Sequence, residues 1–117
     1  IVAEIGSAVT YCAVGDHVVL STFGNCGHCP TCEAGDPGNC SFGGLRHTHT
    51  EGDTELWGFA NLGAFSQETI VHENQAVPIP KEVPLTSAAL IGCGVMTGAG
   101  AVFNRARVEL GDTVVVI

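Results

Sequence analysis

Four of the six cysteines lie close together in the first third of the chain, at Cys26, Cys29, Cys32 and Cys40, with the spacing C-x2-C-x2-C-x7-C. Four thiolates at about 2.3 Å make a tetrahedral zinc site. Three cysteines spaced by three along a glycine-containing turn can point at one centre, and the fourth can return from the far side of the loop. Four protein sulfurs leave no position for water or substrate. The spacing therefore predicts a closed, structural zinc site.

Two other uses of these cysteines are less consistent with the sequence. Disulfides between such closely spaced cysteines would close only tiny loops, and no secretory signal opens the chain. An iron–sulfur cluster shares the C-x2-C-x2-C opening, but the ferredoxin run continues with three residues before its fourth cysteine, whereas seven precede Cys40. The spacing of the cysteines and the geometry it allows favour structural zinc.

The histidines near the cluster have simpler interpretations. His28 lies inside the cysteine segment and could replace a thiolate, but a coordination sphere of four cysteines is already complete, which favours a solvent-facing loop residue. His47 and His49 have the spacing of a metal-ligand pair, yet only Glu51 offers a further ligand nearby, so we expect exposed loop residues.

The two remaining cysteines differ in their surroundings. Cys12, between Tyr11 and Ala13, is expected to be a small buried hydrophobe. Cys93 stands between two glycines just before an expected helix, in the segment Ile-Gly-Cys-Gly-Val-Met-Thr-Gly-Ala-Gly. From its spacing alone Cys93 is either a packed thiol or one ligand of a metal site whose other ligands are not evident.

The elements that must position these residues are β-rich at first and helical later. Residues 1–23 are expected to form a strand, a turn at Gly15-Asp16 and a second strand around 18–20. Residues 24–44 are expected to form a loop with too few large apolar side chains to pack by itself, and residues 67–80 to form two short strands around 69–71 and 76–77. Pro84 can open a short helix through Leu90.

The last quarter of the chain has a helical pattern followed by a strand-like run. Apolar residues recur every three or four positions from Val95 to Ala106, which predicts a helix that ends before Leu110. The β-branched run Thr113–Ile117 is typical of a parallel strand covered on both faces, which requires neighbouring strands. These ends indicate an excerpt of a longer protein.

Composition excludes some classes of function. The 117 residues are 45% apolar and carry a formal net charge of -8, which argues against nucleic acid or an anionic membrane as partner. We see no run that approaches the roughly 18 apolar residues of a membrane-spanning helix, and no secretory signal. The chain is therefore expected to be cytoplasmic.

Taken together, these motifs resemble the zinc-dependent medium-chain alcohol dehydrogenases over essentially the whole chain. The cysteine cluster is similar to the structural-zinc lobe of that family. The segment around Gly92-Cys93-Gly94, Thr97-Gly98 and Gly100-Ala101 resembles the one that holds a catalytic-zinc ligand. The segment Gly111–Val116 resembles the first nucleotide-binding strand.

The resemblance implies the fold and the site residues. It implies a β-rich α+β fold: residues 1–94 would be part of a chaperonin-10-like (GroES-like) catalytic domain with a zinc lobe at about 24–42, and residues 95–117 the connecting helix and first strand of a Rossmann domain. It implies that Cys26, Cys29, Cys32 and Cys40 bind structural zinc, that Cys93 binds catalytic zinc, and that Thr97 lies near the nicotinamide. The loop 42–63 would border the substrate cleft.

The resemblance also implies an activity and its partners. The family oxidises small alcohols to aldehydes or ketones, or the reverse, by hydride transfer with NAD(P), and its members are commonly dimers or tetramers. The family's other catalytic-zinc ligands would lie before Ile1, and its glycine-rich cofactor turn would lie after Ile117. We therefore expect the isolated chain to be inactive. The alternative is a stand-alone zinc-stapled structural or binding module without catalysis.

Overall fold

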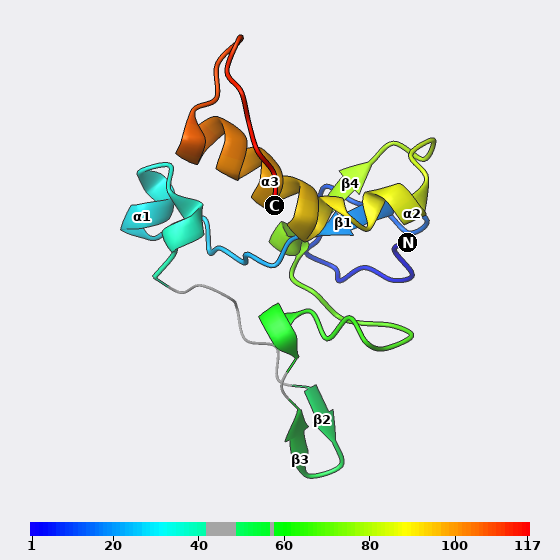
Figure 1. Cartoon of the computed structure of the whole chain (residues 1–117). Helices are drawn as coiled ribbons and strands as arrows, with labels where there is room; N and C mark the ends of the chain where they lie inside the picture. The colour runs from blue at the N-terminus through cyan, green and yellow to red at the C-terminus, as the bar shows by residue number, and fades with distance from the viewer. Residues whose placement is uncertain (42–48, 57) are drawn as a thin grey trace.

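The structure is a computed structural model that describes residues 1–41, 49–56 and 58–117 (Figure 1). Its strands and α-helical turns are β1 (His17–Leu20), α1 (Pro30–Glu33), β2 (His49–Glu51), β3 (Thr54–Leu56), β4 (Ala76–Ile79), α2 (Leu85–Ala88) and α3 (Met96–Ala99). Single 3₁₀ turns span Pro37–Asn39, Phe59–Asn61 and Glu73–Gln75, and π-helical turns at Ile91–Val95 and Gly100–Ala106 flank α3.

An antiparallel pair of strands, β1 and β4, lies at the centre of the chain. His17 pairs with Ile79 and Leu20 with Ala76, so the predicted strands at 18–20 and 76–77 are confirmed. Gly15, with φ of +88°, makes the turn before β1, a conformation that suits glycine. The segment that carries α1 extends to one side of this pair, and the β2–β3 hairpin lies below it in Figure 1.

Helical turns run almost continuously from Leu85 to Ala106 and cross the β1–β4 pair. The predicted short helix after Pro84 and the predicted end of the second helix are confirmed, since the last helical turn stops at Ala106 and Arg107 has a left-handed φ of 52°. The close approach is made by Gly92: a Cβ built there would lie 2.5 Å from the backbone oxygen of Leu20. The absence of a side chain at this position therefore sets the distance between helix and strand.

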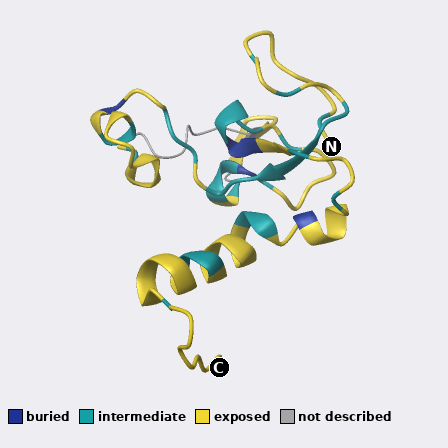
Figure 2. Cartoon of the chain, turned by 90° about the horizontal axis from the view of Figure 1, so that it is seen from above, coloured by how far each residue is buried: buried dark blue, intermediate teal, exposed yellow. Residues whose placement is uncertain are grey.

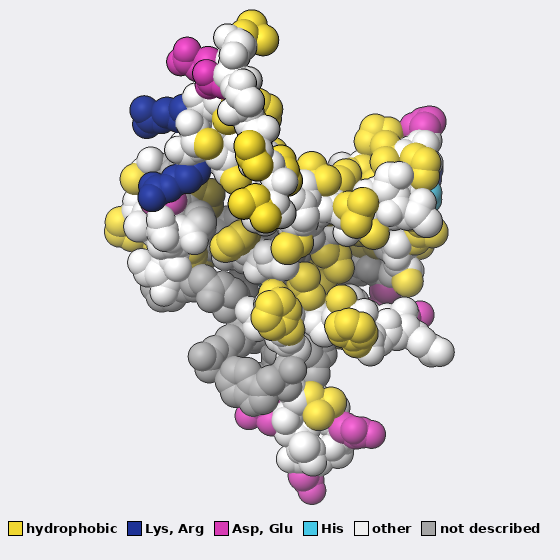
Figure 3. All heavy atoms as spheres, in the orientation of Figure 1, with side chains coloured by type: hydrophobic (Ala, Val, Ile, Leu, Met, Phe, Trp, Pro, Cys, Tyr) yellow, Lys and Arg dark blue, Asp and Glu magenta, His cyan; other side chains and the backbone are white. Residues whose placement is uncertain are grey.

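The same helical segment corrects one expectation from the sequence. By length and composition, the 22 residues of Leu85–Ala106 are sufficient to cross a membrane. Such a helix is weak evidence for a span, because core helices of soluble proteins have the same composition. Apolar side chains gather along the exposed face of this segment (Figure 3), where Leu90, Met96 and Phe103 are more than half exposed.

Very little of the described chain is buried (Figure 2). The buried residues are Cys29, Leu62, Gln75, Ala76 and Ala88. The radius of gyration is 16.8 Å, against about 13 Å for a compact domain of this length. The apolar surface that these elements present is therefore largely uncovered in this chain.

Three expected strands are not formed. Within the described residues, residues 1–5 make two backbone hydrogen bonds, both between Val2 and the Gly15–Asp16 turn, and residues 69–71 form no strand. Residues 113–117 also lack strand pairing, and Val116 is 91% exposed. A strand is stable only when its backbone groups are paired, and no described strand lies beside 113–117 to provide this.

The contact at Gly92 yields a prediction about stability. Replacement by alanine, Gly92→Ala, places a methyl group against the backbone of β1, so we expect the free energy of unfolding to fall by about 1 to 3 kcal/mol. Gly94→Ala is the matched control: its Cβ would meet nothing within 4 Å, and alanine there should leave stability unchanged or raise it by up to about 1 kcal/mol. Urea unfolding of the three chains measures both values, and equal effects at the two positions would contradict the close packing.

Candidate metal centre

The cysteine segment is shaped by a few residues of its own. Gly27 adopts φ of +77°, which turns the chain between the first two cysteines, and Gly35 adopts φ of +83° after α1. Pro30 is the first residue of α1, where its missing N–H costs nothing. The short helix α1 carries Cys32, and the 3₁₀ turn Pro37–Asn39 then leads the chain back to Cys40.

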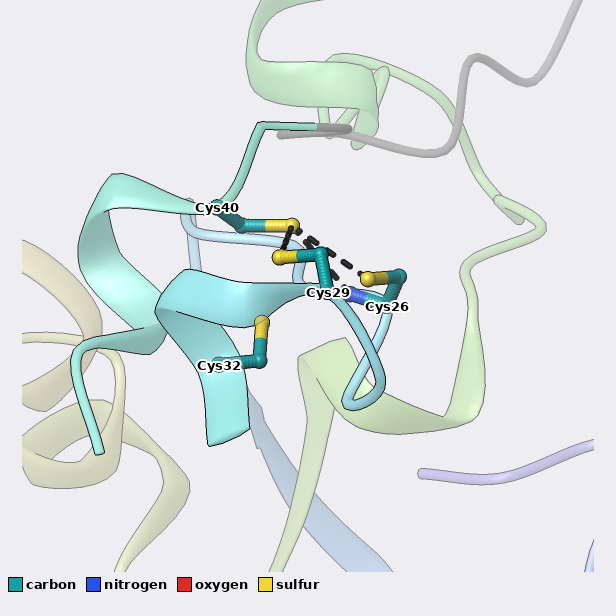
Figure 4. Close-up of side chains that lie close together, drawn as sticks. All are labelled: Cys26, Cys29, Cys32 and Cys40. Atoms are coloured by element: carbon teal, nitrogen blue, oxygen red, sulfur yellow. Dashed lines mark hydrogen bonds between the residues drawn. The ribbon is translucent and has the colours of Figure 1, made fainter. Parts of the chain in front are cut away.

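The four cysteine sulfurs converge on one point: Cys29 and Cys32 lie at the start of α1 and within it, and Cys26 and Cys40 lie on either side of this helix in the sequence (Figure 4). The Sγ atom of Cys40 lies 3.7 Å from that of Cys26 and 3.8 Å from that of Cys29, and all four Sγ atoms lie within 4.8 Å of one another. Sulfurs at the corners of a tetrahedron with zinc–sulfur distances of 2.3 Å would be about 3.8 Å apart. The donor set and its spacing therefore fit a zinc ion, as the cysteine pattern predicts.

Backbone N–H groups surround these sulfurs and favour negative charge on them. The N–H of Cys26 donates to Cys40 Sγ at 3.4 Å, and Cys29 Sγ lies 3.0 Å from the Thr31 hydroxyl. The Thr31 hydroxyl, with help from the backbone N–H groups of Cys32 and Ser41, lowers the pKa of Cys29 to about 5. Cys29 is 2% exposed, so its thiolate is held by these donors rather than by water.

Cys32 has the opposite tendency. Burial and, after it, the neighbouring Cys29 raise the pKa of its thiol to about 11, although the backbone N–H of Gly27 acts in the other direction. Without a metal the cluster therefore keeps a proton on Cys32 at neutral pH. A divalent cation would displace that proton, because metal ligands must be deprotonated.

The histidines and Cys12 do not join the cluster. His28 is exposed, and its Nδ1 lies 2.6 Å from the carbonyl oxygen of Cys26, so the interpretation as a loop residue is confirmed. His47 lies outside the described residues, as does the side chain of His49. Cys12 is partly buried, so the expectation of a small buried hydrophobe is met only in part.

Cys93 lies apart from the cluster, on an apolar pocket. The pocket, of about 390 Å³, is formed by β1, α2 and the turn after Phe59; its lining includes Val18, Leu20, Leu62, Leu85, Ala88 and Cys93. Thr97 follows four residues later in α3, and both Cys93 and Thr97 are exposed. Among the residues described here, only the four clustered cysteines form a group of three or more potential metal ligands. The described donors beside Cys93 therefore do not complete a catalytic zinc site.

The loop expected to border the substrate cleft is only partly described. Residues 42–48 and Trp57 lie outside the described residues. Phe59 is 90% exposed and Leu56 43% exposed, so core packing within this chain does not explain them. Leu62, from the end of this loop, does line the pocket that holds Cys93.

Two residues with a structural role carry no signal in the sequence. Gln75 is fully buried and donates from Nε2 to the carbonyl oxygens of Ser21 and Ala60. Asn74 donates from Nδ2 to the carbonyl oxygen of Asn25. These three hydrogen bonds join residues 15 to 54 positions apart, and neither Asn74 nor Gln75 belongs to a recognisable motif, so only the folded chain identifies them.

Comparison with known proteins agrees with the arrangement of the described residues. Residues 1–81 match the family described as the alcohol dehydrogenase GroES-like domain. The chain is 39% identical to alcohol dehydrogenase B of Mycobacterium tuberculosis over 127 aligned positions, which cover 100% of this chain and 34% of that protein. It is 37% identical to "Probable S-(hydroxymethyl)glutathione dehydrogenase 1" of Schizosaccharomyces pombe, again over 100% of this chain and 34% of that protein.

A solved structure is similar in fold as well as in sequence. The alcohol dehydrogenase zinc-binding domain protein from Burkholderia ambifaria superimposes with a TM-score of 0.73 at 35% identity, over 87% of this chain and 30% of that one. The chain thus spans about a third of the length of these relatives. The expected β-rich, GroES-like fold is confirmed, and the chain belongs to the zinc-type medium-chain alcohol dehydrogenase family as a stretch of its catalytic domain.

Proposed function

We propose that this chain is the zinc-stapled part of an NAD(P)-dependent alcohol dehydrogenase, in which Cys26, Cys29, Cys32 and Cys40 hold a structural zinc. The observation that carries the proposal is the convergence of four sulfurs at near-tetrahedral spacing within a chain that matches this family. The zinc would stabilise a segment that has almost no core of its own: Cys29 is the one buried side chain among its described residues. In this role the site is structural and takes no part in the reaction.

The catalytic role falls to a different part of the chain. We assign Cys93 as one ligand of a catalytic zinc and Thr97 as a residue near the nicotinamide, because both match the family segment and Cys93 lines an apolar pocket. When bound, such a zinc supplies Lewis acidity, and the nicotinamide supplies the hydride acceptor or donor. Cys93 would hold such a zinc as a thiolate at the mouth of the pocket, which apolar side chains of β1 and α2 line.

The domain division follows the same assignment. Residues 1–94 form the partial catalytic domain, with its zinc lobe at about 24–42, and residues 95–117 lead into the nucleotide-binding domain. The uncovered apolar face of Leu85–Ala106 and the unpaired strand-like run at 113–117 support this, because both have the composition of buried elements. The partners would be a small alcohol or aldehyde and further copies of the parent protein, and its location would be the cytoplasm.

The zinc assignment predicts a difference between two cysteine substitutions. Cys40→Ser removes a sulfur that lies within 3.8 Å of the sulfurs of both Cys26 and Cys29. Loss of a residue that only hydrogen-bonds to a metal ligand typically lowers metal affinity by roughly 10- to 100-fold, so we expect loss of the ligand itself to lower zinc affinity by more than that. Cys12→Ser, the control, should retain one zinc per chain. Elemental analysis and chelator competition measure both. Equal zinc binding by the two variants would contradict the site.

The thiol pKa values predict how zinc binding depends on pH. Between about pH 6 and pH 8, Cys29 (pKa about 5) is already ionised, whereas Cys32 (pKa about 11) must release its proton for each zinc bound. Zinc affinity should therefore rise with pH, at least about tenfold per unit for that one proton. Chelator competition, corrected for the chelator's own titration, tests this. An affinity that is independent of pH would show that Cys32 is not a ligand.

The catalytic assignment predicts that the purified chain alone oxidises no alcohol with NAD or NADP, because the described residues place no further metal ligands beside Cys93. Absorbance of reduced nicotinamide at 340 nm, with zinc-loaded chain and short or aromatic alcohols, measures turnover. Measurable turnover would contradict this prediction.

The coding sequence that flanks residues 1 and 117 separates the enzyme from a stand-alone module. A Gly-His-Glu segment before residue 1 and a glycine-rich turn after residue 117 would support the enzyme.

A further inference from the structure

The described part of the zinc lobe runs from Gly24 to Ser41. Among the described residues, one long-range side-chain hydrogen bond joins it to the rest of the chain. Asn74 donates from Nδ2 to the backbone carbonyl of Asn25, with a distance of 2.8 Å between the two atoms. Both residues are partly buried, and 49 positions separate them in the sequence. Asn25 immediately precedes Cys26, the first of the four clustered cysteines. The contact therefore fixes the backbone directly beside a candidate zinc ligand.

The neighbouring residue, Gln75, makes hydrogen bonds to Ser21, at the other end of the stretch that leads from β1 to Cys26. The N–H of Ser21 donates to the carbonyl of Gln75 at 2.7 Å, and Gln75 Nε2 donates back to the carbonyl of Ser21 at 3.2 Å. Gln75 is completely buried, so these two bonds are shielded from water. Ser21 and Asn25 are the two ends of the stretch that leads from β1 to Cys26. One turn thus holds both ends of it.

The turn that makes these contacts is itself fixed by His72. His72 Nδ1 accepts the N–H of Asn74 at 3.2 Å, and the His72 carbonyl accepts the N–H of Gln75 at 2.9 Å. These bonds set the direction of both side chains before they reach across the chain. The turn is followed at once by β4, which pairs with β1, so it is anchored to the central strands.

We infer that the turn His72–Gln75 presets the position of Cys26 for metal binding, with Asn74 as the positioning residue. The lobe lacks apolar side chains that could fix it by packing, so the hydrogen bond to Asn25 limits how far Cys26 moves when the metal leaves. The inference rests on the proposed zinc site, but it concerns a residue that binds no metal and lies outside the cysteine segment.

The test compares metal release from the whole chain and from two asparagine variants. Asn74→Ala removes the donor to Asn25, and Asn104→Ala makes the same chemical change at an exposed helical position with no described hydrogen-bond partner for its side chain. Each chain is loaded with Co²⁺ or Zn²⁺, and release to excess chelator is followed by absorbance. We expect Asn74→Ala to keep one metal and the thiolate–cobalt spectrum but to release the metal about 3- to 10-fold faster, while Asn104→Ala matches the unaltered chain.

The outcomes separate this inference from the proposed zinc site. If the unaltered chain binds no metal, the proposed function fails. If it binds one metal and Asn74→Ala releases that metal at the unaltered rate, the inference is overturned and the zinc site stands. Urea unfolding of the metal-loaded chains checks whether a faster release reflects only a general loss of stability. If Asn74→Ala lowers the stability of the whole chain enough to account for the faster release, the inference fails.

A measurement on the unaltered chain covers the case in which Asn74→Ala does not fold. Coupling between two sites is reciprocal, so metal binding at the cysteines should slow amide hydrogen exchange at Ser21 and Gln75. The amide of Asp112, which donates to the carbonyl of Glu109 near the end of the chain, is the reference whose exchange rate should not change. Slower exchange at Ser21 and Gln75 alone supports the inference, and unchanged exchange at both overturns it.

Discussion

The convergence of four sulfurs is the constraint on which the order of the segment 24–41 depends. This segment has one buried side chain, and that side chain is a cysteine of the cluster. Four thiolates within 4.8 Å of one another repel when ionised, and burial opposes their charge, as the raised pKa of Cys32 shows. A divalent cation would reverse both effects, because it would neutralise the charge and link the four sulfurs directly. With the proposed zinc site, metal binding and local folding of this segment would be coupled.

The rest of the described chain shows the same shortage of internal packing. The β1–β4 pair and the helical run that crosses it meet closely at Gly92, but the outer face of that run is exposed. The relatives with the same sequence features are about three times as long. Elements with a buried composition that lie exposed in this chain are consistent with the proposed place of the segment inside a larger dehydrogenase.

Features that depend on the spacing of neighbouring residues were predicted from the sequence, and features that depend on contacts between distant segments were not. The cysteine cluster, the turn at Gly15, the strands at 18–20 and 76–77 and the helix end near Ala106 all follow from residues within a few positions of one another. The prediction of a strand at 113–117 was wrong for this chain, because a strand needs a neighbouring strand to pair with. Asn74 and Gln75 were missed for a related reason: their partners lie up to 54 positions away, and a polar side chain in a turn has many possible partners.

X-ray absorption at the zinc edge of the zinc-loaded chain tests the four-cysteine site, since it counts the atoms bound to the metal and measures their distances. A closed site of four cysteines predicts four sulfur neighbours at about 2.3 Å and no lighter ligand. A first shell that contains nitrogen or oxygen at about 2.0 to 2.1 Å would contradict it, because a histidine or water would then occupy a position that the structure gives to a cysteine.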